Sequence, residues 1–371
     1  IQIHEEVPIV LENEELYQAV EPLVQWFRAN KRDLPWRHHV NAYRVWVSEI
    51  MLQQTRVEAV KPFYYRFMNE LPTIEALAGA EEDQLLKLWE GLGYYNRVRN
   101  MQIAAKQIVE EYDGQFPREY EQILSLKGIG SYTAGAIASF AFEIPKPAVD
   151  GNVLRVVSRI LENREDIMKA SVRKQMEEKI EKVIPKECPS DFNQGLIELG
   201  AIVCVPNGEP KCDICPLTSF CRAKKLGCQS ELPVKKKAKD RKIEKKTILV
   251  FQDGETVAIH KRSKKGLLAG MYEFPNVDGH LQTEEVVEYC KSIGLMPVFV
   301  KELPPAKHIF SHIEWHMTGY AIRVDELEKQ GPKEFIFAHP EEIQKKYSIP
   351  AAFEAYTKYV NIRLGQNKYE E

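Results

Sequence analysis

Residues 126–134 read LKGIGSYTA, and after an apolar run residues 148–152 read AVDGN. Gly128 and Gly130 stand just before a helix-like pattern, which predicts a tight turn with unpaired backbone N–H groups. Such a turn at the N-terminus of a helix is a ready anion site, and a DNA phosphate is one candidate anion. Asp150 follows Gly130 at a distance of twenty residues. The stretch therefore predicts a helical protein with a backbone anion site and a carboxylate downstream of it.

The bulk composition is that of an ordinary globular protein with two domains. The chain has 371 residues, of which 44% are apolar and 28% are charged, and domains usually run to about 100–200 residues. No apolar run reaches the roughly 20 residues that span a membrane, and the acidic, mixed residues 1–15 do not resemble a secretory signal. We therefore expect a cytoplasmic protein, in which seven cysteines indicate metal binding or free thiols rather than disulfides.

The charge balance restricts where nucleic acid could bind. The net charge is −3, whereas nucleic-acid-binding domains are usually basic, so phosphate contacts must come from local patches. The clearest patch is residues 224–246, with ten Lys or Arg against three Asp or Glu. Low apolar content, Pro233 and the strand-like pattern that follows favour a solvated linker over a binding site here.

Helical periodicity dominates the first 220 residues. The segments with this spacing are 16–29, 58–69, 81–90, 97–112, 134–142, 152–161, 171–183 and 191–203. Apolar residues also follow helical spacing from Trp46 to Val60, which puts Glu49, Gln53 and Arg56 together on the opposite face.

The pattern changes to strands after the basic segment. Residues 247–251 and 256–261 flank Asp253-Gly254, which is a strong hairpin signal. Residues 313, 315 and 317 are apolar and alternate with polar residues, as in a strand with one buried face. The predicted organisation is an all-α domain at 1–230, a basic linker at 231–246 and an α+β domain at 247–371.

Four cysteines are clustered near the end of the helical region. Cys204, Cys212, Cys215 and Cys221 have the spacing C-x7-C-x2-C-x5-C. Four thiolates within eighteen residues suit a tetrahedral sulfur site, either zinc or an iron–sulfur cluster. Unrelated core cysteines would not cluster in this way.

Two acidic residues are candidates for glycosidic bond chemistry, in which a leaving group is protonated and a developing positive charge meets an anion. Glu49 lies among apolar neighbours that would desolvate it and raise its pKa, although periodicity alone favours a surface glutamate on an amphipathic helix. Asp150 precedes Gly151-Asn152 and a helix, so it is also a candidate N-cap. Both roles are compatible, because one oxygen can cap while the other faces a substrate.

These motifs together resemble one group of DNA repair enzymes. The glycine hairpin with its aspartate resembles the helix-hairpin-helix DNA glycosylase superfamily. Within it, the MutY family of adenine DNA glycosylases shows the same motifs in the same order: Trp36-Arg37, residues 45–55, 91–97, the hairpin, 149–152, 192–200 and the four cysteines. The match covers nearly the whole chain, and several of the motifs are long.

The resemblance implies a monomeric enzyme of the bacterial nucleoid that acts on double-stranded DNA. It would extrude adenine mispaired with 8-oxoguanine or guanine, because the glycosidic bond is shielded inside the duplex, and would hydrolyse that bond. The resemblance also implies a [4Fe-4S] cluster in the loop 204–221, on the four cysteines. The family's first cysteine gap is usually six residues, and the extra residue within Val205–Lys211 should lengthen the loop without removing a ligand.

Roles for single residues are implied in the same way. Glu49 would protonate adenine at N7, Asp150 would stabilise the oxocarbenium-like transition state, and Asn152 would orient Asp150 or the water. Tyr132 would pack and hydrogen-bond near Asp150. The adenine pocket would be lined by Arg32, Leu34, Trp36 and Gln194. DNA contacts would come from Arg37, Gly128 and Gly130, with Gln54 and Tyr94 wedged into the base stack. Without the resemblance, Trp36 and Tyr94 would be interpreted as core aromatics and Gln54 as a solvated amide.

Tyr132 discriminates between mechanisms within the superfamily. Endonuclease III-like lyases hold a lysine at this position, and its neutral amine forms a Schiff base with the sugar. A phenol cannot form one, and Lys127 lies on the other side of the glycine turn. We therefore predict a monofunctional glycosylase that leaves an abasic site.

Residues 266–275, GLLAGMYEFP, resemble the start of a Nudix (MutT-like) domain. Nudix hydrolases then need the glutamate-rich R-E-x-x-E-E helix to hold Mg²⁺. Residues 276–295 contain Glu284, Glu285 and Glu288 but no arginine and not that spacing. The fold is therefore expected without the hydrolase site.

In the MutY family this domain reads 8-oxoguanine, and the matching segment is residues 308–312, HIFSH. Phe310, Ser311 and His312 would contact the damaged base, although the segment also fits an ordinary strand-end loop. Three other functions stay open: an endonuclease III-like lyase acting on oxidised pyrimidines, a catalytically inert damage-binding protein, and a Nudix hydrolase.

Overall fold

The computed structural model describes residues 14–236, 240–327 and 331–365. Residues 1–13, 237–239, 328–330 and 366–371, which include parts of both predicted domains and of the predicted linker, lie outside the described residues. The described chain divides into two compact units. The first takes residues up to 68, 72–78 and 103–236. The second takes residues 69–71, 79–102 and the described residues from 240 onward.

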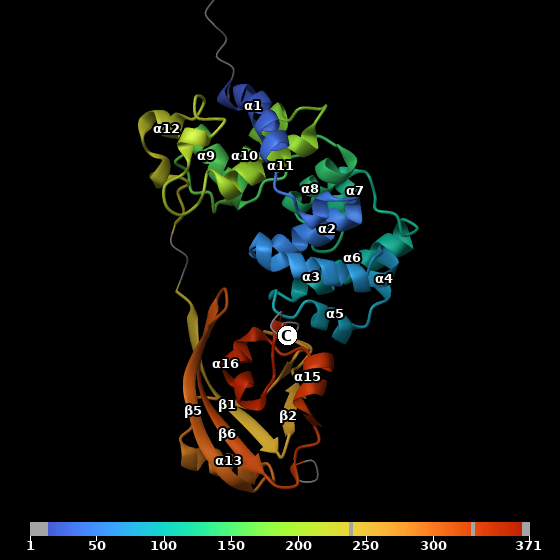
Figure 1. Ribbon diagram of the computed structural model, residues 1–371, viewed down its shortest axis with the longest axis vertical. Helices are drawn as coiled ribbons and strands as arrows, with labels where there is room; N and C mark the ends of the chain where they lie inside the picture. Colours follow the sequence, from blue (N-terminus) through green and yellow to red (C-terminus); the bar gives the residue numbers. More distant parts are fainter. Residues whose placement is uncertain (1–13, 237–239, 328–330, 366–371) are drawn as a thin grey trace, which may run out of the picture. The chain divides into compact units, whose positions relative to one another are not determined.

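The first unit is helical, as the sequence predicts (Figure 1). Its elements are α1 (Glu14–Asn30), η1 (Pro35–Arg37), α2 (Ala42–Leu52), α3 (Val57–Glu70), α4 (Ile74–Gly79), α7 (Tyr120–Ser125), α8 (Ser131–Phe142), α9 (Gly151–Ile160), α10 (Ala170–Val183), α11 (Pro189–Ile202), η2 (Cys212–Ile214), α12 (Arg222–Leu226) and η3 (Gln229–Glu231); α6 (Asn96–Glu111) runs from the second unit into the first.

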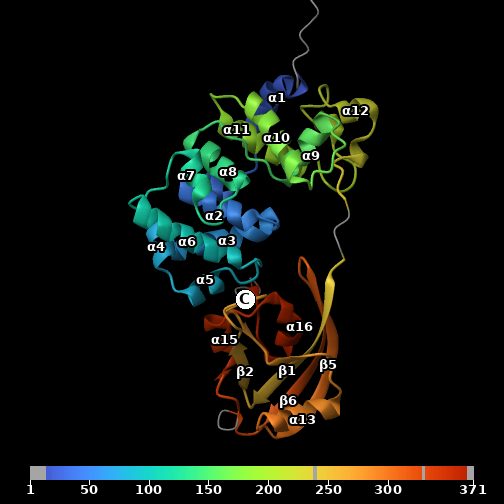
Figure 2. The ribbon, with the colours of Figure 1, turned by 180° about the vertical axis from the view of Figure 1, so that it is seen from behind.

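Each of the eight ranges predicted as helical contains a helix, whereas the short α4, α7 and α12 were not predicted. One apolar core joins α1, α9, α10 and α11, and the view from behind shows these four helices gathered together (Figure 2). The apolar face of each amphipathic helix is thereby removed from water, which is the main stabilising contribution to a helical domain.

Helix α8 is built for close packing against its neighbours. Its sequence SYTAGAIASFAF is rich in small residues, and Thr133 to Phe140 are buried. A Cβ atom on Gly135 would lie 1.9 Å from the carbonyl oxygen of Pro147. Only glycine therefore allows the segment that leads into Asp150 to pass so close to the helix.

The expected helix from Trp46 to Val60 is interrupted. α2 ends at Leu52 and α3 begins at Val57, with Gln54 between them in the left-handed region at φ 60°. The prediction that Glu49, Gln53 and Arg56 share one helical face is therefore wrong, because apolar spacing on both sides of a turn imitated one continuous helix.

The second unit is an α+β fold whose described strands form a seven-stranded sheet in the order β3-β2-β1-β6-β5, with β4 paired to β1 and β7 to β2. The strands are β1 (Lys242–Asp253), β2 (Thr256–Lys261), β3 (Tyr272–Glu273), β4 (Asn276–Asp278), β5 (Pro297–Ile309), β6 (Ile313–Val324) and β7 (Phe335–Ala338). β1 and β6 are parallel, and the other pairs are antiparallel. The predicted hairpin at Asp253-Gly254 is confirmed, with Gly254 at φ 58°.

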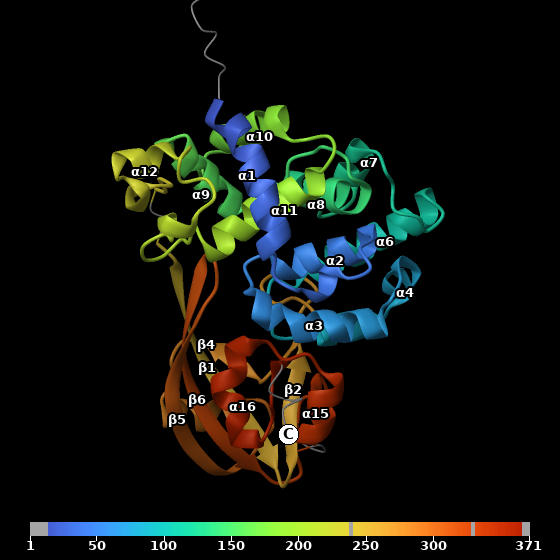
Figure 3. The ribbon, with the colours of Figure 1, turned by 45° about the horizontal axis from the view of Figure 1, so that its top comes forward.

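Helices cover both faces of this sheet. α13 (Thr283–Ser292) packs on one face, where Val286 and Cys290 join the core. The other face carries α15 (Pro340–Lys346) and α16 (Glu354–Thr357), seen in front of the sheet in Figure 3. The short elements η4 (Ala351–Phe353) and η5 (Lys358–Val360) flank α16, and α5 (Glu82–Leu88) also belongs to this unit. Across the described residues, no helix combines the length and the apolar character that crossing a membrane requires.

Candidate active site

The first unit contains a cavity of about 720 Å³ that holds the predicted catalytic side chains. Glu49 reaches it from α2, Tyr132 from the first turn of α8, and Asp150 and Asn152 from the start of α9. The predicted pocket residues Arg32, Leu34, Trp36 and Gln194 also line it. Segments far apart in the sequence thus meet around a space of the size that suits a small ligand.

Glu49 is buried at 6% exposure, so it does not lie on a solvated helix face. Its Oε2 accepts a hydrogen bond from the Tyr132 hydroxyl. Burial raises the pKa of Glu49 to about 7; the Tyr132 hydrogen bond opposes the rise, the Asp150 charge adds to it, and Arg37 opposes it. The carboxyl group is therefore suited to carry a proton near neutral pH.

Asp150 is the N-cap of α9, as its sequence context indicated. Its Oδ1 accepts from the backbone N–H groups of Asn152 and Val153, both at 2.8 Å, and its Oδ2 accepts from Asn152 Nδ2 at 2.7 Å. Burial raises the pKa of Asp150, while these hydrogen bonds and the charge of Arg155 oppose that rise. Three donated hydrogen bonds and a helix N-terminus favour the ionised form.

The hydrogen-bond partner of Tyr132 differs from the prediction. The phenol lies near Asp150 in the same cavity, as expected, but its hydroxyl donates to Glu49. Burial, with the charges of Glu49 and Asp150, raises the pKa of Tyr132 well above its usual value, so the phenol stays a donor. Lys127 is exposed outside the cavity, and its backbone N–H bonds Gln107 Oε1 at 3.0 Å.

The pocket wall combines an aromatic ring with a charged network. Trp36 is buried and meets Tyr64 edge to face, with 5.5 Å between ring centroids. Arg37, expected at the DNA, instead lines the cavity, where its Nε donates to Gln194 Oε1 at 3.0 Å. Glu198, which the sequence reasoning missed, is buried at 1% exposure and bonds Arg32 and Arg37.

The expected DNA-contacting positions of the first unit lie at its surface. Gly128 has φ 77° and forms the predicted tight turn, and both Gly128 and Gly130 are exposed. Gln54 is exposed at φ 60°, a conformation that costs a non-glycine residue free energy. Such strain is often found at functional positions, and the wedge role of Gln54 stays a prediction.

Tyr94, the second expected wedge, belongs to the second unit. It is 49% exposed and also has a left-handed backbone, at φ 49°. Its hydroxyl accepts a hydrogen bond from Ser311 Oγ at 3.1 Å. Tyr94, Ser311 and His312 line a cavity of about 790 Å³ within this unit. Residues 91–97 and 308–312, expected to act on the same base pair, are therefore brought together.

The loop of Phe310, Ser311 and His312 connects β5 to β6. Ser311 and His312 are exposed, whereas Phe310 is partly buried and lies edge to face on Trp315 at 4.9 Å between ring centroids. Arg241 Nε donates to the carbonyl oxygen of Phe310 at 3.1 Å. The apolar base of the loop is thus fixed while its polar tip stays accessible.

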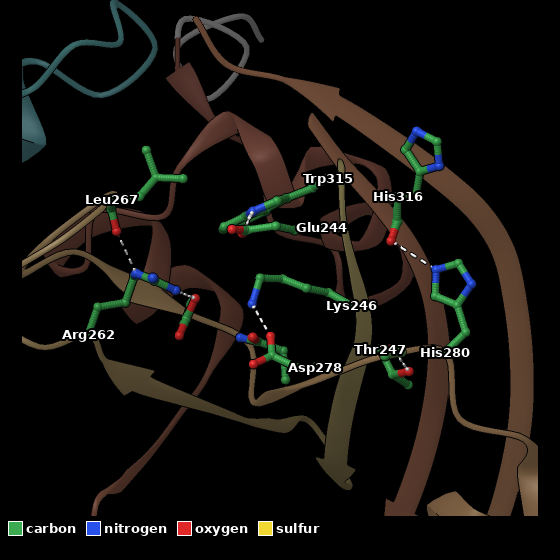
Figure 4. A network of polar contacts seen from close by, with 12 residues as sticks. Glu244, Lys246, Thr247, Arg262, Leu267, Asp278, His280, Trp315 and His316 are labelled. Carbon is green, nitrogen blue, oxygen red and sulfur yellow. Dashed lines mark hydrogen bonds and ion pairs between the residues drawn. The ribbon is translucent and has the colours of Figure 1, made fainter. Parts of the chain in front are cut away.

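Trp315, on which Phe310 packs, belongs to a network of polar contacts that Figure 4 shows from close by. Its indole N–H donates to Glu244 Oε2 at 3.1 Å, and Lys246 Nζ lies 5.1 Å from the ring centroid. Lys246 also pairs with Asp278 at 2.8 Å. The Arg262 guanidinium lies 5.8 Å from the centroid of the Trp315 ring and donates to the carbonyl oxygen of Leu267 at 3.1 Å. These contacts tie the loop's aromatic support to β1, β4 and the segment after β2.

The alternative of a Nudix hydrolase, left open by the sequence, finds no support in the geometry of α13. Glu285 Oε2 accepts the backbone N–H of Gln282 at 2.7 Å, so this carboxylate caps the helix. Lys291 and Ser292 occupy the end of the helix. The carboxylate of Glu285 is thus used to stabilise the helix end rather than held open towards a cavity.

The four clustered cysteines line one small cavity together with Arg159. Each is partly buried, and Arg159 Nη1 lies 3.2 Å from Cys204 Sγ. Within the described ranges, no three His, Cys, Asp or Glu side chains are arranged as a ready site for a metal ion. Four thiols around one cavity nevertheless fit the donor set of a sulfur-ligated centre.

The comparisons with known proteins agree with the two-part architecture. Residues 47–186 match the family model of HhH-GPD superfamily base excision DNA repair proteins, and residues 247–359 match that of the NUDIX domain. Among solved structures, a thermostable thymine-DNA glycosylase is 29% identical with a TM-score of 0.53, and a non-covalent endonuclease III–DNA complex is 26% identical with a TM-score of 0.50. Each similarity covers 58% of this chain and 98% of the other.

Curated relatives extend the match over most of the chain. The adenine DNA glycosylase of Rattus norvegicus is 35% identical over 361 residues, covering 82% of this chain and 70% of the relative. That of Buchnera aphidicola subsp. Schizaphis graminum is 33% identical over 315 residues, covering 83% and 88%.

The fold, the carboxylate cavity and these matches define a helix-hairpin-helix DNA glycosylase of base excision repair that carries a Nudix-like domain. More narrowly, the chain belongs to the adenine DNA glycosylase family. The resemblance drawn from the sequence motifs is thereby confirmed.

Proposed function

We propose that this enzyme extrudes adenine opposite 8-oxoguanine, or opposite guanine, from duplex DNA and removes it by hydrolysis. The observation that carries the proposal is the pair of carboxyl groups in one cavity, both buried but with different hydrogen-bond partners. Glu49 is buried with a raised pKa of about 7 and one donor, whereas Asp150 caps a helix and accepts three hydrogen bonds. Such a pair separates a proton donor from an anion.

Glu49 donates its proton to N7 of the leaving adenine, which turns the base into a better leaving group. The Tyr132 hydroxyl fixes the carboxyl group that does so. Asp150 faces the sugar as an anion and stabilises the positive charge that develops as the bond breaks. Asn152, bonded to Asp150 Oδ2 at 2.7 Å, holds this carboxylate in position.

The enzyme is proposed to be monofunctional and to leave an abasic site. Schiff-base chemistry needs a neutral amine at the sugar, and the side chain at the corresponding position is the Tyr132 phenol. Lys127 is exposed and does not line the cavity. These observations support hydrolysis by water over the lyase alternative.

The choice of opposite base is assigned to the loop at Phe310–His312. Ser311 and His312 are exposed and lie beside Tyr94, the expected wedge, in one cavity. A hydroxyl and an imidazole can each both donate and accept hydrogen bonds, as reading the edge of 8-oxoguanine requires. Because duplex DNA is the substrate, we place the enzyme at the bacterial nucleoid.

A [4Fe-4S] cluster is proposed on Cys204, Cys212, Cys215 and Cys221. The family resemblance favours it over zinc, and the four thiols line one cavity. A bound cluster would cross-link the loop of residues 204–221, and no catalytic step passes through it. A broad visible absorption band would support the cluster, and a colourless, zinc-loaded protein would refute it.

The proposal is tested with duplexes that contain A:8-oxoguanine, A:G, G:T or thymine glycol:A. After incubation, one half of each sample receives alkali and the other borohydride. Alkali-dependent cleavage at adenine, with no borohydride-trapped adduct, is the expected result. Cleavage at thymine glycol with trapping would favour the lyase, cleavage only at G:T would favour a thymine glycosylase, and cleavage of none would favour a damage-binding protein.

A further inference from the structure

Glu198 is a buried carboxylate that none of the catalytic steps above uses. It lies on α11, two turns after Pro189-Ser190, and its side chain is 1% exposed. An ionised carboxylate without partners is very costly at such a position. Its partners therefore indicate why it is there.

Two arginines that line the same cavity, Arg32 before η1 and Arg37 within it, satisfy this carboxylate. Arg32 donates to Oε1 from its backbone N–H at 3.0 Å and its Nε at 2.7 Å, and to Oε2 from Nη2 at 3.0 Å. Arg37 Nη2 donates to Oε2 at 3.0 Å. Burial alone would raise the pKa of Glu198, but the hydrogen bonds and charges of the two arginines lower it. The carboxylate is thus ionised and fully occupied.

Arg37 connects this cluster with the predicted base pocket. Its Nη1 donates to the carbonyl oxygen of Arg32 at 2.8 Å, and its Nε donates to Gln194 Oε1 at 3.0 Å. Gln194 Nε2 in turn donates to Ser190 Oγ at 3.0 Å. The orientation of the Gln194 amide is therefore set through Arg37.

The same arginine acts on the proton donor. The groups that face Glu49 are Tyr132 from α8, Asp150 at the start of α9 and Arg37 from η1. Arg37 carries a positive charge, which favours the deprotonated form of Glu49 and so opposes proton donation. Two arginines and one carboxylate leave the cluster at +1, and without Glu198 it would be +2.

We propose that Glu198 is a positioning residue of the adenine cavity. Its carboxylate holds Arg32 and Arg37 in the wall and offsets their charge beside Glu49, so that Glu49 keeps the proton it donates. The inference rests on the proposed role of Glu49 as general acid.

The test is the pH dependence of single-turnover adenine excision in four variants. The rate is carried by protonated Glu49, so it falls as the pH rises through the pKa of that group. In Glu198→Gln the uncompensated arginines favour deprotonation of Glu49. The alkaline limb, which is the part of the pH profile where the rate falls as the pH rises, therefore moves to lower pH by roughly half a unit to one unit. In Arg37→Gln the positive charge is lost, and the limb moves to higher pH.

Glu181→Gln is the matched control. It also removes one carboxylate and one ion pair from the first unit, but Glu181 is 44% exposed and pairs with Lys146 on the surface of α10. Its limb should coincide with that of the wild type. Opposite shifts in Glu198→Gln and Arg37→Gln would support the proposal, since a loss of folded protein lowers the amplitude without moving the limb.

Unchanged limbs in both cavity variants would overturn the proposal, whatever happens to the rate. If thermal melting shows that Glu198→Gln is unfolded, the test rests on Arg37→Gln alone. An alkaline limb at higher pH than in the wild type then supports the proposal, and an unmoved limb overturns it. Glu49→Gln separates the two levels of inference. If that variant keeps the wild-type rate and limb, Glu49 is not the general acid, and the proposed role of Glu198 is wrong for that reason. This result differs from unmoved limbs in Glu198→Gln and Arg37→Gln, which would refute the role of Glu198 alone.

Discussion

The cavity of the first unit and the loop of Phe310–His312 in the second unit are built in opposite ways. Glu49 is 6% exposed, and Glu198, which lines the same cavity, is 1% exposed. Ser311 and His312, in contrast, are exposed at the tip of a three-residue connection between two strands. Each region suits the task we assign to it.

Burial is what the chemistry needs, because low dielectric surroundings raise the pKa of a carboxyl group and strengthen the charge interactions around it. Reading a base needs polar groups that are accessible yet fixed. In the loop this is achieved from below, where Phe310 packs on Trp315 and Arg241 bonds the Phe310 carbonyl oxygen. Substitutions in the cavity should therefore lower the rate of excision, whereas substitutions in the loop should lower the preference for one opposite base over another.

The largest expected effect is on the cavity. Glu49→Gln removes the proton donor and should slow adenine excision roughly 10²–10⁴-fold. The rate with A:8-oxoguanine and with A:G should fall by the same factor, because the proton donor does not contact the opposite base. Single-turnover rates on both duplexes measure this. A loss of rate confined to one duplex would show that Glu49 also affects the choice of opposite base, and would contradict the assignment of chemistry and base reading to separate regions.

A smaller and selective effect is expected at the loop. The double substitution Ser311→Ala and His312→Ala removes two hydrogen-bonding groups, each worth about 1 kcal/mol, so the preference for A:8-oxoguanine over A:G should fall roughly tenfold or more. The rate on A:G should stay near that of the wild type. Thr318→Ala, a substitution at a hydroxyl in the middle of β6, serves as a control for disturbance of this unit. An undiminished preference would remove the reading role from the loop.

The smallest expected effect is on the free energy of unfolding, and it separates the capping role of Asp150 from its role in catalysis. Asparagine is also a good N-cap, so Asp150→Asn should abolish excision but leave the free energy of unfolding nearly unchanged. Asp150→Ala should lose both activity and about 1 kcal/mol of stability. Denaturant unfolding of the two proteins provides the comparison. Equal destabilisation by both substitutions would show that the cap hydrogen bonds at 2.8 Å contribute little.

Local sequence signals predicted the features that depend on near neighbours. The amphipathic helices, the Asp253-Gly254 hairpin and the N-cap at Asp150 are each encoded within one element. The four cysteines could be grouped by spacing alone, and the structure brings them to one cavity. These predictions succeeded because spacing and capping act over a few residues.

Features set by distant contacts could not be predicted in this way. Glu198 lies 166 residues from Arg32, and no pattern around either residue indicates the other. Arg37 was therefore assigned to DNA, and Tyr132 was assigned to Asp150 instead of Glu49. The turn at Gln54 was missed because apolar spacing continues across it. In each case contacts between residues far apart in the sequence, or the packing of neighbouring helices, set the structure that was observed.

The pH dependence of single-turnover excision at A:8-oxoguanine by the wild-type enzyme tests the central claim most directly. Because burial raises the pKa of Glu49 to about 7, the account predicts a rate that is high at acidic pH and falls as the pH rises through neutrality. The product at every pH should be an abasic site cleaved only after alkali. A rate that rises with pH, together with strand cleavage trapped by borohydride, would contradict it.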